Sequence, residues 1–166
     1  MESFNEYINE YKKQLKQGAI QKAYQGLMEY IMSLRTHFNS KYPNYFVSGS
    51  VYQGYMDMTY FSFIPESLKN RKLRIAIVFS YNTFRFEVWL AGYNKQVQSK
   101  YWKLFKESGW NKYRLVSPQK GVDSIVEHTL VENPDFSELD TLTTQIESGA
   151  LLFIKDVEEF LSDHKI

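Results

Sequence analysis

The chain has 166 residues, with 20 Lys and Arg against 19 Asp and Glu, a formal net charge of +1 and no cysteine. A chain of this length is typical of one domain that buries its own core. The absence of cysteine excludes disulfides, thiolate zinc sites and cysteine nucleophiles. We therefore expect a single domain over residues 1–166 in a reducing, cytoplasmic setting.

Apolar residues occur only in short runs, of which Ile75–Phe79 is typical. Such runs are far below the roughly 18 residues that a helix needs to cross a bilayer. The N-terminal segment also lacks the continuous apolar stretch of a signal peptide. With 43% hydrophobic and 17% aromatic residues the chain has ample apolar surface to bury. We expect a folded, soluble protein that does not enter a membrane.

Two helices are predicted at the N-terminus. Ser3 and Glu6 stand at capping-box spacing, and apolar residues then recur at helical intervals up to Gly18. A second apolar stripe with helical spacing runs over residues 20–38 and ends before Pro43. We expect these helices to form a hairpin whose apolar stripes face the rest of the domain.

From Tyr45 onward the period of the apolar residues changes from about 3.6 to 2, which is typical of strands. Aromatic and β-branched residues, which favour strands, dominate this part of the chain. The alternation predicts four successive strands, over residues 46–52, 56–63, 73–79 and 84–90. The last two are separated by a short turn and are expected to form a hairpin.

After this hairpin the sequence predicts another helix, capped by Asn94 and ending near Glu107. Two further strands are predicted at residues 112–116 and 124–131.

The final predicted element is a helix that opens at Ser137 and contains Gly149, where it can kink or split. The complete pattern predicts an α+β fold. It consists of an N-terminal helical hairpin, a central and mainly antiparallel β-sheet with one inserted helix, and a C-terminal helix that packs on the sheet.

The small net charge hides an uneven distribution. Residues 1–120 hold 18 basic and 8 acidic side chains, a balance of +10, whereas residues 121–166 hold 2 basic and 11 acidic ones, a balance of −9. Such a division indicates an anionic partner for the basic part. The alternative is that the acidic last helix docks on the basic body and neutralises it.

Four lysines gather on one face of the predicted third helix. On a helical wheel Lys95, Lys100, Lys103 and Lys106 fall within about 140° of arc, and Trp102 lies at the edge of this face. A lysine face edged by an indole can hold phosphates by charge and stack a base or sugar. The alternative is the ordinary solvated face of an amphipathic helix.

Most familiar catalytic and cofactor patterns are absent. The three histidines fall in different predicted elements at no metal-ligand spacing, and the chain has neither a Walker A motif nor G-x-G-x-x-G. We expect no metal and no cofactor.

A second candidate site lies on the predicted strands. Asp57 and Glu87 stand among apolar neighbours, with Arg85 close by, in a region rich in aromatic residues. A metal-dependent nuclease would place lysine two residues after the acid, where this chain has Trp89. These four residues could line a catalytic or small-ligand pocket. In the alternative interpretation, Glu87 pairs with a neighbouring arginine and the aromatic residues fill the core and a dimer contact.

Four segments carry a resemblance to a known family: 48–50 (Ser-Gly-Ser), 55–61, 85–92 and 94–97. In this order they resemble an uncharacterised bacterial family of single-domain proteins, a domain of unknown function, so the resemblance implies no activity. Residues 84–131 are also similar, through Glu87 and Trp110, to a small module found in proteins near restriction systems. This second similarity keeps nucleic acid among the candidate partners.

The sequence thus supports two functional hypotheses. The first is a non-catalytic binding module whose basic helix face engages nucleic acid or an acidic protein. The second is an enzyme or small-ligand protein that uses Asp57, Arg85 and Glu87, so catalysis stays an open question. The surplus of aromatic residues favours a homodimer.

Overall fold

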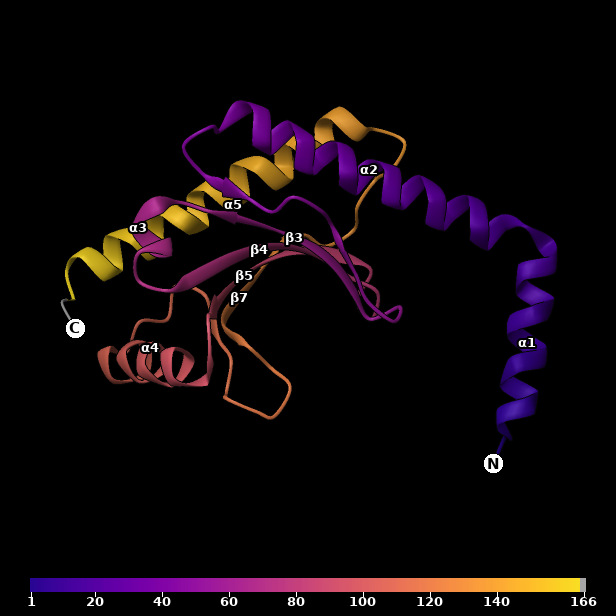
Figure 1. Cartoon of the computed structure of the whole chain (residues 1–166), viewed down its shortest axis with the longest axis horizontal. Coiled ribbons are helices and arrows are strands. Elements are labelled where there is room, and N and C mark those ends of the chain that lie inside the picture. Colours follow the sequence, from indigo (N-terminus) through magenta and orange to yellow (C-terminus); the bar gives the residue numbers. More distant parts are fainter. Residues whose placement is uncertain (165–166) are drawn as a thin grey trace.

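The computed structural model describes residues 1–164, and the last two residues of the predicted domain and final helix lie outside it. Within the described residues, five helices surround one seven-stranded antiparallel sheet (Figure 1). The helices are α1 (Phe4–Gln17), α2 (Ala19–Lys41), α3 (Glu66–Lys69), α4 (Lys95–Ser108) and α5 (Leu139–Ser162). The strands are β1 (Phe46–Val47), β2 (Tyr52–Gln53), β3 (Met58–Ile64), β4 (Leu73–Ser80), β5 (Arg85–Gly92), β6 (Arg114–Leu115) and β7 (Ser124–Val131).

The strands are ordered β1-β3-β4-β5-β7-β6, and β2 also pairs with β3. Helices α2 and α5 lie on one face of this curved sheet, and α4 lies on the other (Figure 1). The predicted α+β class, with N-terminal helices, an antiparallel sheet, one inserted helix and a C-terminal helix on the sheet, is therefore confirmed.

The core lies mainly between the sheet and the helices α2 and α5. Phe38 of α2 packs its ring against Phe61 and Phe63 of β3, with ring centroids 5.8 and 4.7 Å away. On α5, Phe153 is fully buried and contacts the ring of Tyr113 at 4.9 Å. Alternate residues of the strands supply the other side of this layer, as expected for side chains that point to opposite faces of a sheet.

The hairpin of β4 and β5 forms the middle of the sheet. Its two strands pair over eight positions, from Leu73 opposite Gly92 to Ser80 opposite Arg85. Both predicted strands are therefore confirmed: β4 extends one residue beyond the predicted range, and β5 starts one residue later and ends two residues later than predicted. Because β3 and β7 pair with the outer edges of this hairpin, its register fixes the positions of all neighbouring elements.

The predicted strand over residues 46–52 is broken in the structure. β1 pairs with one end of β3 and β2 with the other, and the segment between them leaves the ladder. There the side-chain oxygen of Ser48 accepts the N–H of Ser62 at 3.0 Å, and its carbonyl accepts the Nε–H of Arg35 at 2.5 Å. One backbone hydrogen bond remains, from the N–H of Ser48 to the carbonyl of Ser62 at 3.2 Å. The bonds of the Ser48 side chain and of Arg35 replace the rest of the regular pairing, an outcome that strand periodicity does not encode.

The N-terminal helix is capped as predicted but packs differently. The side chain of Ser3 accepts the N–H of Glu6 and the side chain of Glu6 accepts the N–H of Ser3, and Gly18 ends α1 with φ of 80°. However, α1 has no buried residue, bends sharply from α2 and stands apart from the rest of the molecule (Figure 1). The expectation that both apolar stripes face the domain is therefore confirmed for α2 and wrong for α1.

Helix α5 is continuous through Gly149, so the glycine does not split it. Its role is steric, because a Cβ at Gly149 would lie 2.8 Å from the side chain of Leu130 on β7. The atom concerned is the terminal methyl of Leu130, so a larger residue at position 149 requires that side chain to move.

A buried carboxylate joins α2 to α5. Glu147, 8% exposed, accepts hydrogen bonds from Lys41 at 2.7 Å and from Tyr42, and it pairs with His37 Nε2 at 2.9 Å. Burial by itself would raise the pKa of Glu147, but the hydrogen bonds from Lys41, Tyr42 and His37 outweigh it and lower this pKa from 4.5 to about 2. The ionised side chain therefore stabilises the folded state.

This contact predicts a pH-dependent effect of Glu147→Gln on the free energy of unfolding. Because the folded-state pKa is lowered, the stabilisation by Glu147 is complete above pH 4.5 and is lost as the pH falls toward 2. We expect the variant to be less stable by about 2 kcal/mol at pH 7, with the difference shrinking below pH 4.5. Urea unfolding followed by circular dichroism at pH 7, 4.5 and 3 measures it. Glu159→Gln, at an exposed position of the same helix, is the control. If the difference in unfolding free energy between wild type and Glu147→Gln stays constant with pH, the stabilising role of the ionised Glu147 is wrong.

Candidate anion-binding site

Two basic segments that are distant in the sequence meet at one end of the sheet. The first comprises residues 69–74, from α3 into β4, and the second comprises residues 95–106 of α4. Together they contain eight Lys or Arg and no Asp or Glu. They are neighbours because Leu73, which starts β4, pairs with Gly92, which ends β5 just before α4.

A hollow of about 700 Å³ lies between these two segments. We call it the basic cleft. Three of its lining residues are cationic, namely Arg71, Lys72 and Lys100. The others are the side-chain amides of Asn70 and Gln96, the apolar Val97 and the aromatic Tyr101. No acidic side chain is among these lining residues, so the cleft is suited to an anion.

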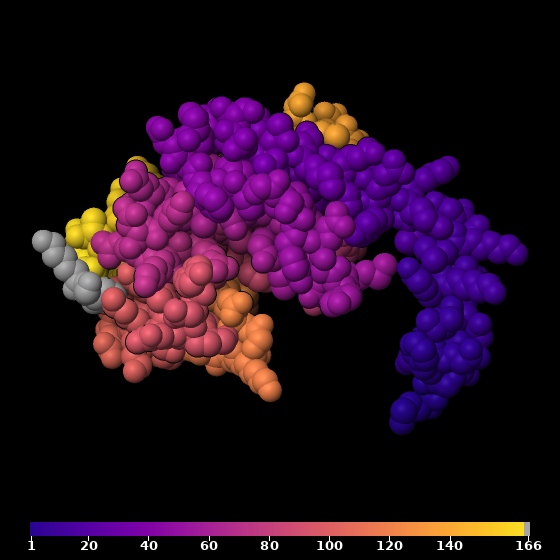
Figure 2. All heavy atoms as spheres, in the orientation of Figure 1, coloured from indigo at the N-terminus to yellow at the C-terminus, as the bar shows by residue number. Residues whose placement is uncertain are grey.

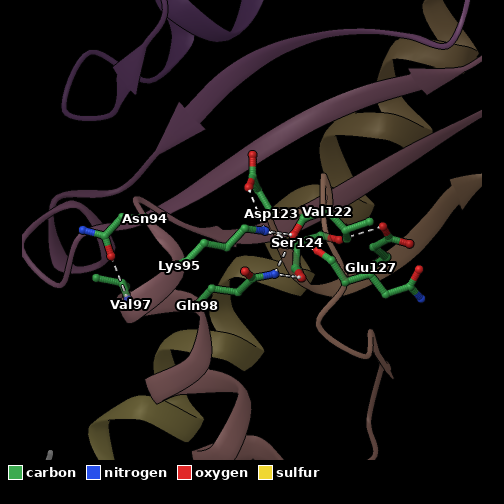
Figure 3. Close-up of polar contacts among 9 residues, drawn as sticks. Asn94, Lys95, Val97, Gln98, Val122, Asp123, Ser124 and Glu127 are labelled. Carbon is green, nitrogen blue, oxygen red and sulfur yellow. Dashed lines mark hydrogen bonds and ion pairs between the residues drawn. The ribbon is translucent and has the colours of Figure 1, made fainter.

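The start of α4 is held by Lys95 and Gln98, which point toward the segment before β7, and by Asn94, which points to the helix itself (Figure 3). Asn94 caps the helix, its Oδ1 accepting the N–H of Val97 at 2.9 Å. Lys95 donates to the carbonyl of Val122 at 2.6 Å, and the side-chain amide of Gln98 donates to the same carbonyl at 2.8 Å. The wall of the cleft that α4 provides is thus held in place by several polar contacts.

The opposite wall is a tight turn. Lys72 adopts a left-handed backbone conformation with φ of 60°, and its carbonyl accepts the N–H of Tyr93 at 2.9 Å. The guanidinium of Arg71 donates to the carbonyl of Leu161 at the end of α5, at 3.2 Å. Arg74 lies over the ring of the exposed Tyr93, 4.6 Å from its centroid. The cations of this wall are therefore held by backbone and aromatic contacts and not by carboxylates.

Most of the positive charge here is unneutralised. Of the eight basic residues, only Lys95 forms an ion pair within residues 1–164, with Asp123 at 3.4 Å. The acidic C-terminal part pairs elsewhere: Glu147 with Lys41, Asp156 with Lys112, and Glu127 with Arg114. Helix α5 lies mainly on the other face of the sheet from α4 (Figure 1). No acidic side chain of α5 lines the basic cleft, although Glu158 and Glu159 line a neighbouring hollow together with Arg71.

The predicted lysine face is divided between two roles. Lys103 and Lys106 are exposed, as a ligand-binding role requires, whereas Lys95 is engaged with the segment before β7. Trp102 is half-buried and packs against the core. Its indole nitrogen is buried and has no hydrogen-bond partner among the described residues. The tryptophan therefore does not present its N–H to solvent.

The residues of the second predicted site are only partly brought together. Glu87 is 4% exposed on β5 and accepts hydrogen bonds from Arg85 Nε at 3.0 Å and from Trp89 Nε1 at 2.9 Å. Asp57 lies on the exposed turn before β3, two strands away, and its side chain accepts the N–H of Met58. None of these four predicted residues lines the basic cleft. The pairing of Glu87 with a neighbouring arginine matches the structural alternative, and the catalytic hypothesis stays a prediction.

Sequence reasoning missed Arg71 and Lys72 as parts of a site. The signal for them was the run Lys69-Asn70-Arg71-Lys72, which precedes the clearest predicted strand. A basic run before a strand is common and does not by itself indicate a site. The pairing of β4 with β5 is what places residues 69–72 beside the lysines of α4.

Two kinds of feature are absent from the part of the chain that the structure describes. Within residues 1–164, no three His, Asp or Glu side chains come together in a way that could hold a metal ion. Every helix in the same range is too short or too polar to span a bilayer.

Residues 4–161, nearly the whole described chain, match a family described as a domain of unknown function (DUF7000). The chain belongs to this family. The match confirms the resemblance to an uncharacterised family and assigns no activity to it. No curated protein and no solved structure matches the chain.

The position of α4 depends on Gly92, which predicts a strong effect of Gly92→Ala. A Cβ at this position would lie 2.5 Å from the backbone nitrogen and 2.8 Å from the Cα of Gln98, so the helix would have to move. We expect a loss of about 1 to 3 kcal/mol in the free energy of unfolding, measured by urea denaturation.

Gly26→Ala is the matched control, because a Cβ on this exposed glycine of α2 meets no atom within 4 Å. We expect it to stabilise the protein by up to about 1 kcal/mol through helix propensity. Equal effects of the two substitutions would contradict the assigned steric role of Gly92.

Proposed function

We propose that the protein is a non-catalytic binding module that holds the phosphate backbone of a nucleic acid in the basic cleft and along the adjoining face of α4. The observation that carries this proposal is the meeting of two basic segments, without an acidic residue in either, around an open hollow of about 700 Å³. The runner-up partner, an acidic protein segment, would use the same charges.

The spacing of the cations supports a polyanion. Lys100, Lys103 and Lys106 follow one another at intervals of three residues, so each is displaced by about 4.5 Å along the helix axis and about 60° around it. Lys72 continues this charged surface across the cleft. A distributed surface of this kind suits several phosphates in succession better than one small anion.

The contacts around the cleft favour backbone binding over base recognition. Lysines offer mobile point charges, which bind phosphates without reading the sequence. The exposed ring of Tyr93 beside the cleft could add stacking with an unpaired base. We therefore expect single-stranded nucleic acid to bind with little sequence preference.

Reversing charge on the two walls tests the proposal. We expect Lys72→Glu/Lys100→Glu to bind a fluorescent single-stranded oligonucleotide about tenfold more weakly. We also expect a plot of the logarithm of the binding constant against the logarithm of the salt concentration to be less steep, by about 0.7 for each phosphate that the variant no longer neutralises. Fluorescence anisotropy at several salt concentrations measures both quantities. Lys103→Glu/Lys106→Glu should weaken binding in the same direction.

The matched control is Lys12→Glu/Lys155→Glu, which makes the same change in net charge at exposed positions outside the cleft. If this control weakens binding as much as the cleft variant, the effect is one of overall charge and the proposed site is wrong. Binding of polyglutamate but not of oligonucleotides would assign the cleft to an acidic protein. The absence of salt-sensitive binding to any of these probes would refute the proposal.

A further inference from the structure

Helix α1 exposes a complete apolar stripe. Its members recur on one face, and the most exposed are Phe4 at 79%, Tyr7 at 57% and Tyr11 at 50%. Ile8 lies between them at 43%. An isolated helix of 14 residues is only marginally stable in water, and a stripe of large apolar side chains ordinarily lies against another element. The stripe therefore lacks its packing partner.

The same chain carries an apolar groove without an occupant, which we call the α2 groove. It encloses about 620 Å³ between the first half of α2, the turns before β3 and β5, and the segment leading into α5. Aromatic and aliphatic side chains dominate its walls, among them Tyr24, Leu27, Met56, Tyr81, Phe84 and Phe136.

Within one chain, no residue of α1 lines this groove. The carbonyl of Leu15 accepts both the N–H of Gly18, at 3.1 Å, and the side-chain amide of Gln21, at 2.6 Å. The carbonyl of Gly18 accepts the N–H of Lys22, in the first turn of α2, at 3.3 Å. These bonds fix the bend between the helices, and Figure 2 shows an open notch between α1 and the body.

We infer that the occupant of the α2 groove is α1 of a second copy of this chain, in a reciprocal arm-exchanged dimer. Each copy then donates its arm and receives its partner's arm, as a two-fold interface requires. The inference concerns a different surface from the basic cleft and does not depend on the proposed function.

The dimensions of arm and groove agree. The stripe from Phe4 to Tyr11 extends roughly 11 Å along its helix, and the groove follows α2 from Ile20 to Tyr30 for roughly 15 Å. An aromatic side chain buries about 150–250 Å² when it is fully covered. The three partly exposed rings and Ile8 therefore supply about 500 Å² of buried surface per arm. The groove walls lose a similar area, so the two contacts of a dimer bury about 2,000 Å² in total, within the range of stable interfaces.

The charges at the rim are also complementary. Lys16 follows the apolar stripe on α1, and Lys13 beside it pairs with Glu10 of the same helix at 3.8 Å. Glu138 and Asp140 flank the groove residue Leu139 at the start of α5, and Lys22 lines the groove on the α2 side. An arm seated in the groove of another copy brings basic and acidic ends within reach of each other, which favours this pairing over random association.

The experiment uses the full chain with one substitution on the arm, Ile8→Glu, and one in the groove, Tyr24→Glu. Both residues are exposed, so neither change should disturb the fold, which circular dichroism verifies. We expect wild type to sediment as a dimer and each variant as a monomer in analytical ultracentrifugation. Asn9→Glu, the neighbouring exposed position off the apolar stripe, is the matched control and should stay dimeric.

Mixing the two variants identifies the contact. An equimolar mixture contains intact arms in one chain and intact grooves in the other, so we expect a heterodimer that is weaker than the wild-type dimer. A dimer that survives Tyr24→Glu would instead show contact between two arms and overturn the inference. A wild-type monomer at all concentrations would also overturn it.

Cysteine substitution distinguishes exchange between copies from closure within one chain, because the protein has no cysteine of its own. Chains with Ile8→Cys mixed with chains carrying Tyr24→Cys should form a covalent dimer of mixed composition with a bismaleimide cross-linker. If the double variant Ile8→Cys/Tyr24→Cys cross-links only within single chains, α1 occupies its own groove and the dimer is excluded.

Discussion

The register of the β4–β5 hairpin is the constraint on which the rest of the molecule depends. Because Leu73 lies opposite Gly92, the turn that leads into β4 is placed beside the helix that follows β5. Gly92 then allows the backbone of α4 to approach at a distance that a Cβ would forbid. A shift of one residue would turn every side chain of the hairpin to the wrong face and would separate the two basic segments.

The sheet also separates the charges of the chain. Helix α5 packs on the face opposite α4 (Figure 1), and its buried acids are satisfied there by local partners. Glu147 is held by three donors, and Asp156 accepts hydrogen bonds from Lys112 at 2.9 Å and Tyr113 at 2.5 Å. Among the described residues, ion pairing between the basic and acidic parts is thus confined to these contacts and to the pairs Arg114–Glu127 and Lys95–Asp123, while Lys100, Lys103 and Lys106 of α4 keep their charge toward solvent. Buried carboxylates in this protein stabilise the fold, and the exposed cations are available for binding.

The two unsatisfied surfaces lie at different ends of the molecule. The basic cleft is formed at the start of β4, whereas the α2 groove is lined by Tyr81 and Phe84 beyond the opposite end of the hairpin. An exchanged dimer would therefore leave both basic clefts open. Two clefts on one particle would raise the effective concentration for a long polyanion, since binding at the first holds the strand near the second.

Local patterns in the sequence determined the regular elements. The Ser3–Glu6 capping box, the Asn94 cap and the alternation in β5 each depend on neighbours within a few residues, so they could be predicted directly. The break between β1 and β2 could not, because it depends on hydrogen bonds between Ser48 and residues on other elements. The lysines of α4 were identified for the same local reason, as residues on one helical face.

Only the tertiary structure decided which of these features meet. Arg71 and Lys72 join the lysine helix through strand pairing, a contact between segments more than twenty residues apart that periodicity does not record. Glu87 and Asp57, similar in their local sequence, are separated because one lies within the sheet and the other on an exposed turn. The sequence likewise determined that α1 is amphipathic, but whether its apolar stripe is buried depends on the bend fixed at Gly18. A helical pattern specifies which face is apolar, and the packing of the whole chain decides what covers it.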